Sequence, residues 1–373
     1  MSSFSEQYLE ELVRDGASPT AAENNYIFGS SLAYRTYLID SFKTENGALG
    51  YQSQASVARP GVEGVLQEND ITTRGGYHEI SVGLAGNMAD RLYMGGSLNI
   101  PVVHYQRELR YKESDLSGNP DNNFNFFELT ETSTSRGIGI NAKLGMIYKP
   151  QESFRLGLAF HTPSFISFRD NIRAAMTTDT ENYTRFGVVT ETSNNLNNDN
   201  AGDRQYNMQT PWRMIGSFSY VFREVNDTRR QKGFVSADVE YVNYRSARFY
   251  ASDGGDRTAT DYYLSLNDKI KDYYKGAINA RLGGELKFNT MMVRAGAAYY
   301  GNPNAQSEDL KARRILASGG VGYRNHGMFI DLTYVHSFNR DVNFPYRLND
   351  KPNTFADQTG SRGNIVATLG FKF

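Results

Sequence analysis

The stretch Ile365–Phe373 (IVATLGFKF) ends the chain with strict alternation between apolar residues and their neighbours. Successive side chains of a β-strand point to opposite faces, so this pattern predicts a strand with one fully apolar face. In water such a strand would leave an aggregation-prone edge, whereas in a transmembrane β-barrel it pairs at closure and lipid covers its apolar face. We interpret the ending as an outer-membrane insertion signal, with Phe373 as the contact for the barrel-assembly machinery. An edge strand of a soluble β-sandwich is the alternative interpretation.

The composition agrees with a barrel. The 373 residues include 35 Gly, 25 Tyr and 22 Phe but one Trp and no Cys, and the mean hydropathy is −0.56. No window approaches the ~18 consecutive apolar residues that a membrane helix needs. Barrel strands do not form such an apolar run, because half of each strand's side chains face a polar lumen. The net charge of −1 and the pI of about 6.6 argue against nucleic acid as a partner.

The alternating pattern recurs about eleven times along the chain. The longest examples are Leu92–Val102 and Ile138–Tyr148, in which every second residue is apolar or glycine. Shorter examples are Tyr77–Gly86, Leu156–Phe160, Trp212–Tyr220, Val235–Tyr241, Ile278–Leu282, Val293–Ala297, Ala317–Val321, Ile330–Tyr334 and the terminal strand. The sequence therefore predicts an all-β fold, a transmembrane antiparallel up-and-down β-barrel with short helices in its external loops.

The connections between these strands alternate in length. Short turns are predicted at 87–90, 149–153, 289–290 and 324–327, and long polar loops at 114–125, 170–207 and 252–275. Outer-membrane barrels show this asymmetry, with short periplasmic turns and long external loops. A soluble sandwich distributes its loop lengths less regularly. The loop asymmetry therefore favours the membrane barrel.

Residues 1–75 differ in pattern from the predicted barrel, residues 76–373, and we interpret them as an extracellular segment with short helices. Phe4–Asp15 places its apolar residues on one helical stripe. Leu32–Asp40 (LAYRTYLID) fits a strand or a second short helix. Met1 is followed by polar residues rather than by a basic stretch and an apolar core, so the signal-peptide pattern is absent.

The strand count has a topological consequence. The terminal strand should end in the periplasm, so about eleven strands counted back place the start of the first one, near Tyr77, outside the cell. Bacterial single-chain barrels have an even number of strands. An odd count without an export signal predicts that the chain is the C-terminal part of a longer protein. The alternative is a miscounted strand, for which Leu32–Asp40 is the candidate.

Several segments resemble one family of outer-membrane proteins. Gly137–Ser164 (GIGINAKLGMIYKPQESFRLGLAFHTPS) resembles the strand, Lys-Pro turn and strand of FadL-type transporters, which import long-chain fatty acids and aromatic hydrocarbons. Phe234–Ala247 (FVSADVEYVNYRSA), Asn279–Phe288 (NARLGGELKF) and the terminal IVATLGFKF are similar to further segments of that family. Gly75–Tyr105, together with LAYRTYLID, is similar to its Bacteroidetes branch. The resemblance spans residues 32–373.

The resemblance implies a monomeric barrel of about fourteen strands in the outer membrane of a Gram-negative bacterium, plugged by an N-terminal hatch. A long-chain fatty acid or another hydrophobic compound would bind at an external apolar site and then in a pocket inside the barrel. It would leave when the hatch moves or through an opening in the wall. The hatch and about three leading strands have no counterpart here, in agreement with the predicted truncation. Phe4–Val13 and Tyr262–Tyr274 could form the external groove, or they only cap loops.

Strand parity predicts which charged residues face the lumen. If the apolar faces meet lipid, the residues that point inward are Lys143, Arg213, Asp238, Glu240, Arg281, Glu285, Arg294 and Asp331. Both charge signs occur on neighbouring strands, so most of these side chains should pair across strands. A fatty-acid carboxylate needs one basic group left unpaired or shared. The ligand-binding candidates, in no order, are Lys143, Arg213, Arg281 and Arg294.

Other functions have less support in the sequence. The five histidines lack metal-ligand spacing, Cys is absent and no GxSxG motif occurs, so we predict no enzyme, no metal and no cofactor. His161 lies near Thr162 and Ser164, as in a barrel phospholipase, but its inward parity argues against a site on the outer wall. A porin-like channel without a plug and a surface receptor or adhesin that uses the long loops stay open. A sugar or phosphate channel would need a constriction dominated by one charge sign.

Overall fold

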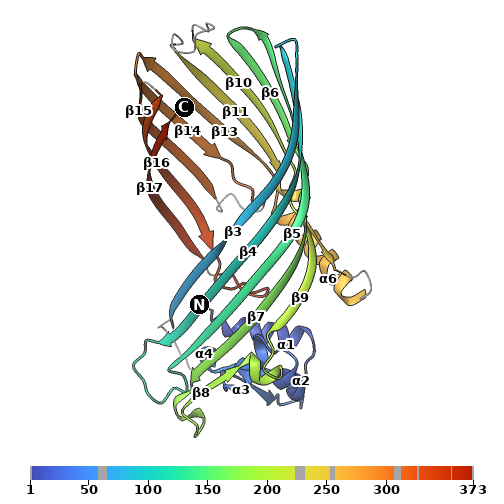
Figure 1. Cartoon of the computed structure of the whole chain (residues 1–373). Helices are drawn as coiled ribbons and strands as arrows, with labels where there is room; N and C mark the ends of the chain where they lie inside the picture. Colours follow the sequence, from blue (N-terminus) through green and yellow to red (C-terminus); the bar gives the residue numbers. More distant parts are fainter. Residues whose placement is uncertain are drawn as a thin grey trace.

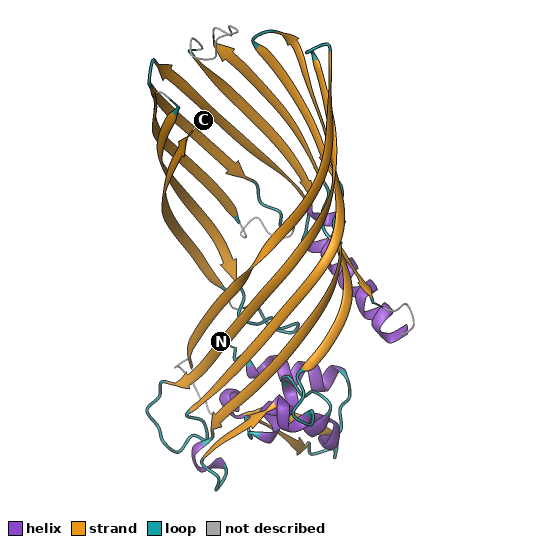
Figure 2. Cartoon of the chain, viewed as in Figure 1, coloured by secondary structure: helices purple, strands orange, loops and turns teal. Residues whose placement is uncertain are grey.

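The computed structural model describes residues 2–57, 65–222, 232–252, 257–305, 312–325, 327–353 and 355–371. A 15-stranded antiparallel sheet curls into the wall of a barrel (Figure 1), and a second sheet has two strands. The helices gather at one end of this wall and beside it (Figure 2). Among the described residues, no helix is long and apolar enough to cross a membrane. The predicted all-β, antiparallel fold is confirmed.

The N-terminal segment contains four short helices and the two-stranded sheet. Their bounds are α1 Ser5–Arg14, α2 Pro19–Asn24, α3 Ser30–Arg35, β1 Ile39–Lys43, β2 Leu49–Ser53 and α4 Gln54–Val57. The first half of the large sheet comprises β3 Val65–Met88, β4 Leu92–Asp115, β5 Phe126–Gln151, β6 Phe154–His161, β7 Phe165–Asp179, β8 Val188–Thr192 and β9 Gly202–Gln209. Two short helical turns interrupt it, η1 Glu181–Tyr183 and α5 Ser193–Leu196.

The second half of the large sheet contains the remaining strands. They are β10 Arg213–Phe222, β11 Gly233–Asn243, β12 Arg248–Ala251, β13 Gly276–Phe288, β14 Met291–Tyr300, β15 Arg313–Asn325, β16 Met328–Asn343 and β17 Ala356–Phe371. The turn η2 Tyr244–Ser246 separates β11 from β12, and the helix α6 Arg257–Tyr273 precedes β13. The helix predicted within residues 261–274 is therefore present, and it begins earlier than expected.

Ten successive antiparallel pairings lead around the wall from β3 to β17. At two positions of the wall, a proline separates one strand from the next. Pro163 lies between β6 and β7, and Pro211 lies between β9 and β10. A proline cannot donate to the ladder, so the strand bends there. Ten pairings join eleven wall positions, which confirms the strand count predicted from the alternation.

The two edges of the wall are open within the described residues. There β3 pairs with β4 alone, and β17 pairs with β16 alone. Because an even number of antiparallel pairings separates them, β3 and β17 run in the same direction. An up-and-down antiparallel sheet therefore cannot close by joining these two strands directly.

The outward face of the wall is apolar. On β3, Ile80, Val82 and Leu84 are 62%, 73% and 86% exposed, and Leu98 of β4 is 64% exposed. Short turns join the strands at one end of the wall, which we call the turn end. Exposed large apolar side chains at every second strand position are the expected surface of a barrel that lipid surrounds. The fold thus defines a membrane-spanning wall.

The strands at the opposite end of the wall are longer than predicted. β3, β4 and β5 have 24, 24 and 26 residues, whereas about 9–11 suffice to cross a membrane. The expected strand starts at Tyr77 and Ile138 are therefore too late. The predicted loop 170–207 is also wrong, since it contains the end of β7, all of β8 and most of β9. Asn- and Thr-rich sequence resembled a loop because lipid does not contact these parts of the strands.

One glycine within β3 has a backbone conformation that other residues rarely adopt. Gly75 has a φ of +140°, and a Cβ added there would lie 2.1 Å from the carbonyl oxygen of His104 on β4. Only glycine accommodates both this backbone conformation and this close approach. A side chain at position 75 would push β3 away from β4 at this level.

Residues 2–57 form a compact unit that we call the N-terminal cap. It packs on the long strands at the end of the wall opposite the turns, so we call this the cap end (Figure 1). Phe4, Tyr8 and Leu12 of the cap share a core with Tyr111 and Phe127 of β4 and β5. The predicted helix at Phe4–Asp15 is confirmed as α1. The β4 ladder with β3 is unbroken, so Tyr111 is on the lumen-facing side of its strand.

The segment Leu32–Asp40 is divided between two element types. Its first residues belong to α3, which ends at Arg35, and its last two belong to β1. The sequence pattern left helix and strand open, and each part of the segment adopts one of them. It does not join the wall, because β1 pairs with β2. It is therefore not a miscounted strand of the barrel.

A buried carboxylate ties the cap to the wall. Glu113 of β4 is 0% exposed. It accepts hydrogen bonds from the backbone N–H of Phe4 at 2.8 Å, the Tyr111 hydroxyl at 2.8 Å, the Gln67 amide at 3.0 Å and the Ser3 hydroxyl. Several donors on one carboxylate are what make burial of a charge tolerable.

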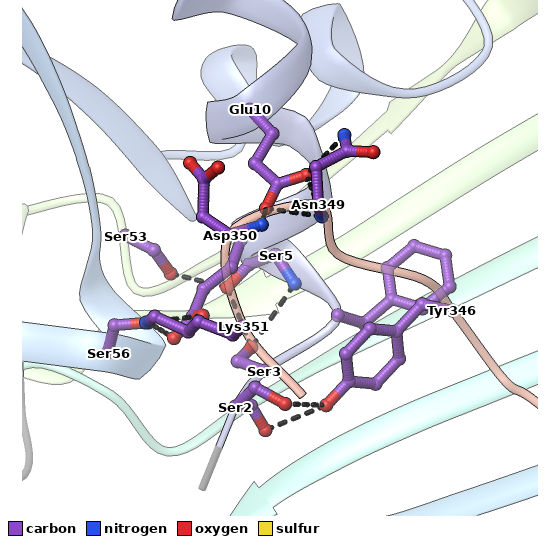
Figure 3. A network of polar contacts seen from close by, with 12 residues as sticks. Ser2, Ser3, Ser5, Glu10, Ser53, Ser56, Tyr346, Asn349, Asp350 and Lys351 are labelled. Carbon is purple, nitrogen blue, oxygen red and sulfur yellow. Dashed lines mark hydrogen bonds and ion pairs between the residues drawn. The ribbon is translucent and has the colours of Figure 1, made fainter. Parts of the chain in front are cut away.

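The loop between β16 and β17 packs against the N-terminal cap (Figure 3). The Tyr346 hydroxyl donates to the Ser2 carbonyl at 2.8 Å, and the Gln67 amide of β3 donates to Tyr346 at 3.2 Å. The Glu10 carboxylate accepts the backbone N–H and side-chain amide of Asn349, each at 2.9 Å. Lys351 forms an ion pair with Glu6 at 2.7 Å. The cap thus links β3 to the loop before β17, although these two strands do not pair.

Candidate ligand-binding site in the lumen

The four predicted cations lie on strands of the wall, and each forms an ion pair with a carboxylate of another strand. Lys143 of β5 forms an ion pair with Glu79 of β3. Glu79 also accepts a hydrogen bond from Tyr77 at 2.9 Å and a longer one from the amide of Asn141 at 3.4 Å. One ammonium therefore faces one well-bonded carboxylate, and the charge of Lys143 is balanced.

Arg294 of β14 is balanced as well. Its guanidinium bonds Glu285 of β13 at 2.6 Å and Asp331 of β16 at 2.7 Å. Lys287 stands 3.8 Å from the same Glu285. Two cations and two carboxylates make this group neutral, which is the cross-strand pairing predicted from parity.

Arg213 and Arg281 share one carboxylate. Glu240 of β11 is buried, with its side chain 3% exposed, and it forms a short ion pair with Arg281 of β13. The amide of Asn279 donates to the same carboxylate at 3.1 Å. Arg213 of β10 reaches the other oxygen at 3.5 Å only. Two guanidinium groups therefore share one carboxylate, and the looser cation is Arg213; Asp238 lies opposite Arg281 in the strand register, but within the described residues it forms no ion pair with either arginine.

Exposure distinguishes the four candidates further. The side chain of Arg213 is 50% exposed, against 31–34% for Lys143, Arg281 and Arg294. Arg281 also lies over the Tyr300 ring at 5.6 Å, which adds a cation–π contact. Among these four residues, Arg213 has the longest ion pair and the greatest access to the lumen.

His161 of β6 stands between two of these cations. In the strand register, His161 is opposite Arg213 on one side and opposite Lys143 on the other. Its Nδ1 atom is buried and lacks a hydrogen-bond partner in the described part of the chain. Parity predicts that His161 points inward but assigns it no role, and Glu79 is absent from the inward residues that the sequence predicts. The signal for Glu79 was its position beside the outward-facing Ile80.

The two external helices do not provide an open apolar groove. Tyr8 and Leu12 of α1 are buried in the core that the cap shares with the wall. On α6, Tyr263 and Ile270 are buried, and the Asn267 amide bonds both backbone groups of Phe249 at 2.8 Å. A cavity of about 540 Å³ lies beside α1, but polar groups such as Glu10, Glu11 and Arg14 line much of it. Capping of loops is the better interpretation of both helices.

Two further features concern metal binding and the end of the chain. In the described ranges, no group of three or more His, Cys, Asp or Glu side chains is placed to hold a metal ion. Phe373, the predicted contact for the assembly machinery, lies outside the described residues, and β17 is described to Phe371. That contact stays a prediction.

No family model matches the chain, and no curated protein sequence matches it. Among solved structures, it is similar to the toluene transporter TbuX of Ralstonia pickettii at 15% identity, over 90% of this chain and 77% of that one, with a TM-score of 0.45. It is similar to a FadL homologue of Pseudomonas aeruginosa at 13% identity, over 79% and 78% of the two chains, with a TM-score of 0.44. The toluene transporter TodX of P. putida gives 11% identity, 82% and 89% coverage and a TM-score of 0.38. Similarity at this level does not transfer a ligand to this chain.

Proposed function

We propose that the chain is part of an outer-membrane transporter for hydrophobic acids, and that a long-chain fatty acid binds in the lumen with its carboxylate on Arg213. The observation that carries this proposal is that two lumen-facing guanidinium groups form ion pairs with the same carboxylate, and that one of these pairs is long. Lys143 and Arg294 belong to neutral groups, whereas Arg213 and Arg281 share the single carboxylate of Glu240. A carboxylate of a ligand would complete that group as a charge-assisted partner of the exposed guanidinium.

Binding of the rest of the ligand would be hydrophobic. Each buried CH₂ group contributes about 0.8 kcal/mol, so a long acyl chain supplies most of the affinity. Arg213 would then select acids among hydrophobic compounds, and a neutral aromatic hydrocarbon would bind without it. The resemblance of Gly137–Ser164 to FadL-type transporters supports the same substrate class.

The arrangement of lumen charges speaks against the channel alternatives. Selective channels for anions or cations use rings dominated by one charge sign. Here cations and carboxylates pair between strands that are adjacent, as in Glu285 with Arg294, or one strand apart, as in Glu79 with Lys143. A wall of paired charges leaves few sites for a passing ion and favours a single bound anion at the loosely paired Arg213.

We further propose that other strands complete this wall between β3 and β17. Both strands have an open edge in the described ranges and run in the same direction, so an odd number of additional strands is needed for antiparallel closure. A segment that precedes this one in a longer chain, as in the Bacteroidetes-like branch that the sequence resembles, would supply them. Assembly as a monomer in the outer membrane of a Gram-negative bacterium, with insertion guided by Phe373, belongs to the same proposal.

Ligand binding by the protein in detergent or lipid bilayers tests the transport proposal. Arg213→Ala should weaken binding of a long-chain fatty acid about tenfold or more, because a charge-assisted hydrogen bond is lost. The same variant should bind the methyl ester as the wild type does. Arg324→Ala, at the turn end and away from the lumen group, is the matched control.

Three outcomes would contradict this function. Equal affinity of wild type and Arg213→Ala for the acid would remove Arg213 from the site. Absence of acid and hydrocarbon binding, combined with sugar permeation in liposome swelling, would favour the porin-like alternative. Absence of both activities, with retained binding of a protein or cell surface by the cap end, would favour a receptor or adhesin.

A further inference from the structure

A second pocket lies on the outside of the wall. It measures about 560 Å³ and is bounded by the last residues of β11, the turn η2, the end of α6 and the beginning of β13. Figure 1 shows α6 projecting from the outer side of the wall. The pocket therefore lies apart from the lumen group around Arg213.

Strand parity places the floor of this pocket on the lipid-facing surface. Glu240 points into the lumen, where it pairs with Arg281, so its neighbour Tyr241 points outward. Val239, two residues earlier on the same face, is 55% exposed. The Tyr241 hydroxyl lies against Gly276 of β13, where a Cβ would come within 2.2 Å of it. Glycine at 276 thus gives the tyrosine ring room on the outer face.

An aromatic row fixes the level of the pocket relative to the membrane. Phe160 of β6, Trp212 just before β10 and Tyr241 of β11 follow one another around the wall, with ring centroids 5.9 and 5.6 Å apart. Aromatic side chains with one polar atom concentrate where lipid headgroups meet water, and barrels carry a girdle of them at each interface. The pocket opens at the end of this row, next to Tyr274.

The walls of the pocket are basic. Arg245, Lys271 and Lys275 line it, with Asp272 as the single acidic residue in the lining. Lys271 forms an exposed pair with Asp268 at 2.9 Å. Within the described residues, the guanidinium of Arg245 and the ammonium of Lys275 form no hydrogen bond or ion pair. Two cations therefore remain available at the membrane boundary.

We infer that this pocket binds the phosphorylated headgroup of an outer-leaflet lipid, with Arg245 and Lys275 on the phosphate and Tyr241 and Tyr274 beside the first acyl carbons. Basic residues at the bilayer surface attract anionic lipids, and tyrosine suits the boundary between headgroup and chain. This inference assumes the outer-membrane location proposed above, but it does not depend on Arg213 or on the transported ligand.

This pocket differs from a simple phosphate site because it adjoins the outward, lipid-facing surface of the wall. A free phosphate would use the cations alone, whereas a phosphorylated lipid also covers Tyr241 and the outward residues below it, such as Val239. The combined contact predicts that the acyl chains and the phosphates both contribute to affinity. Lipid A, a diphosphorylated glucosamine lipid, is the probe that carries both features.

Native mass spectrometry of the full chain in detergent measures this binding. We expect the wild type to retain lipid A about tenfold better than dephosphorylated lipid A, because two phosphate-binding cations act at the surface. Arg245→Glu combined with Lys275→Glu should abolish that preference, and higher salt should reduce it. Lys43→Glu combined with Arg185→Glu, two exposed positions at the cap end, is the charge-matched control and should retain the preference.

The outcomes separate this site from the proposed transport function. Equal retention of both lipids by the wild type, or an unchanged preference in the Arg245→Glu, Lys275→Glu variant, would overturn the assignment. Complete displacement of lipid A by an equal concentration of inorganic phosphate would assign the pocket to a soluble anion instead. Fatty-acid binding should be intact in this double variant and lipid A retention intact in Arg213→Ala, so each proposal can fail alone. Intact heat resistance of the sheet would show that the double variant is folded.

Discussion

The two halves of β4 carry their apolar residues on opposite faces of the strand. In the membrane-spanning half, the even-numbered Leu98 and Ile100 point to lipid and are 64% and 44% exposed. In the half at the cap end, the odd-numbered Leu109 and Tyr111 are buried, at 9% and 1% exposed. The ladder with β3 has no bulge between them, so the strand itself does not rotate its faces. What changes is the surroundings, from lipid on the outside to the N-terminal cap on the inside.

The polar groups of the two regions differ in the same way. In the lumen, the cations near Glu79 and Glu240 are partly exposed and form ion pairs between different strands. Under the cap, Glu113 is fully buried and is held by hydrogen bonds from four residues. A cation in the lumen can therefore exchange its carboxylate partner for a ligand. At the cap interface, loss of the Glu113 carboxylate would leave buried hydrogen-bond donors unsatisfied.

Glu113→Ala is expected to have the largest effect, and it acts on the cap end alone. The substitution leaves the buried N–H of Phe4 and the hydroxyl of Tyr111 without their acceptor, at a cost of about 3 kcal/mol or more. Hydrogen exchange of the α1 amides should become fast, while amides in the membrane-spanning halves of β4 and β5 stay protected. Arg110→Ala, on the opposite face of β4 in an exposed pair with Glu128, is the control and should leave α1 protected. Slow exchange of α1 in Glu113→Ala would show that apolar packing alone holds the cap.

Leu98→Arg should have a somewhat smaller effect, confined to the membrane-spanning half. A charge on the lipid face near the bilayer centre costs about 2–4 kcal/mol. Unfolding of the protein in lipid vesicles measures this loss, and protease sensitivity of the cap should not change. Ser81→Arg, which faces the lumen from β3, should cost much less. Equal costs for both substitutions would contradict the assignment of outward and inward faces.

Tyr183 provides the smallest expected effect, a pH dependence of cap docking. Its hydroxyl donates to Asp40 of the cap at 2.6 Å, and burial together with that carboxylate raises the pKa of Tyr183 to about 12. The neutral phenol is favoured in the docked state, so its contribution is fully present below about pH 10 and is lost as the pH rises towards 12. Proteolysis within residues 2–57 should increase over this interval, and Tyr183→Phe should remove that part of the pH response. An identical pH profile in Tyr183→Phe would assign the effect to another group.

The sequence predicted the membrane-spanning wall well and the cap end poorly. Alternation such as Ile138–Tyr148 identifies a strand because lipid requires one apolar face throughout. The sequence pattern predicts a loop for the outer parts of β7 and β9, because their partner surface is the cap and neighbouring strands rather than lipid. The helix at Phe4–Asp15 was predicted from its stripe, but its use as a groove was not decided by the pattern. A stripe indicates that a face is buried, not what buries it.

The candidate site shows the same division. Parity alone placed Lys143, Arg213, Arg281 and Arg294 on the inward face, and the structure supplies the distances that rank them. The position of His161 between two cations depends on the register of β6 against β5 and β10, which no local pattern encodes.

The amino-acid sequence by itself determined the strand periodicity, the number of wall positions and the side of each strand that meets lipid. These properties follow from alternation over a few residues and from the chemistry of the surrounding bilayer. Only the tertiary structure decided which carboxylate each cation meets, that Arg213 is left with a shared partner, and that the cap covers the far halves of the strands. Those contacts join residues tens or hundreds of positions apart, such as Tyr346 with Ser2, and depend on register and loop path rather than on any local signal.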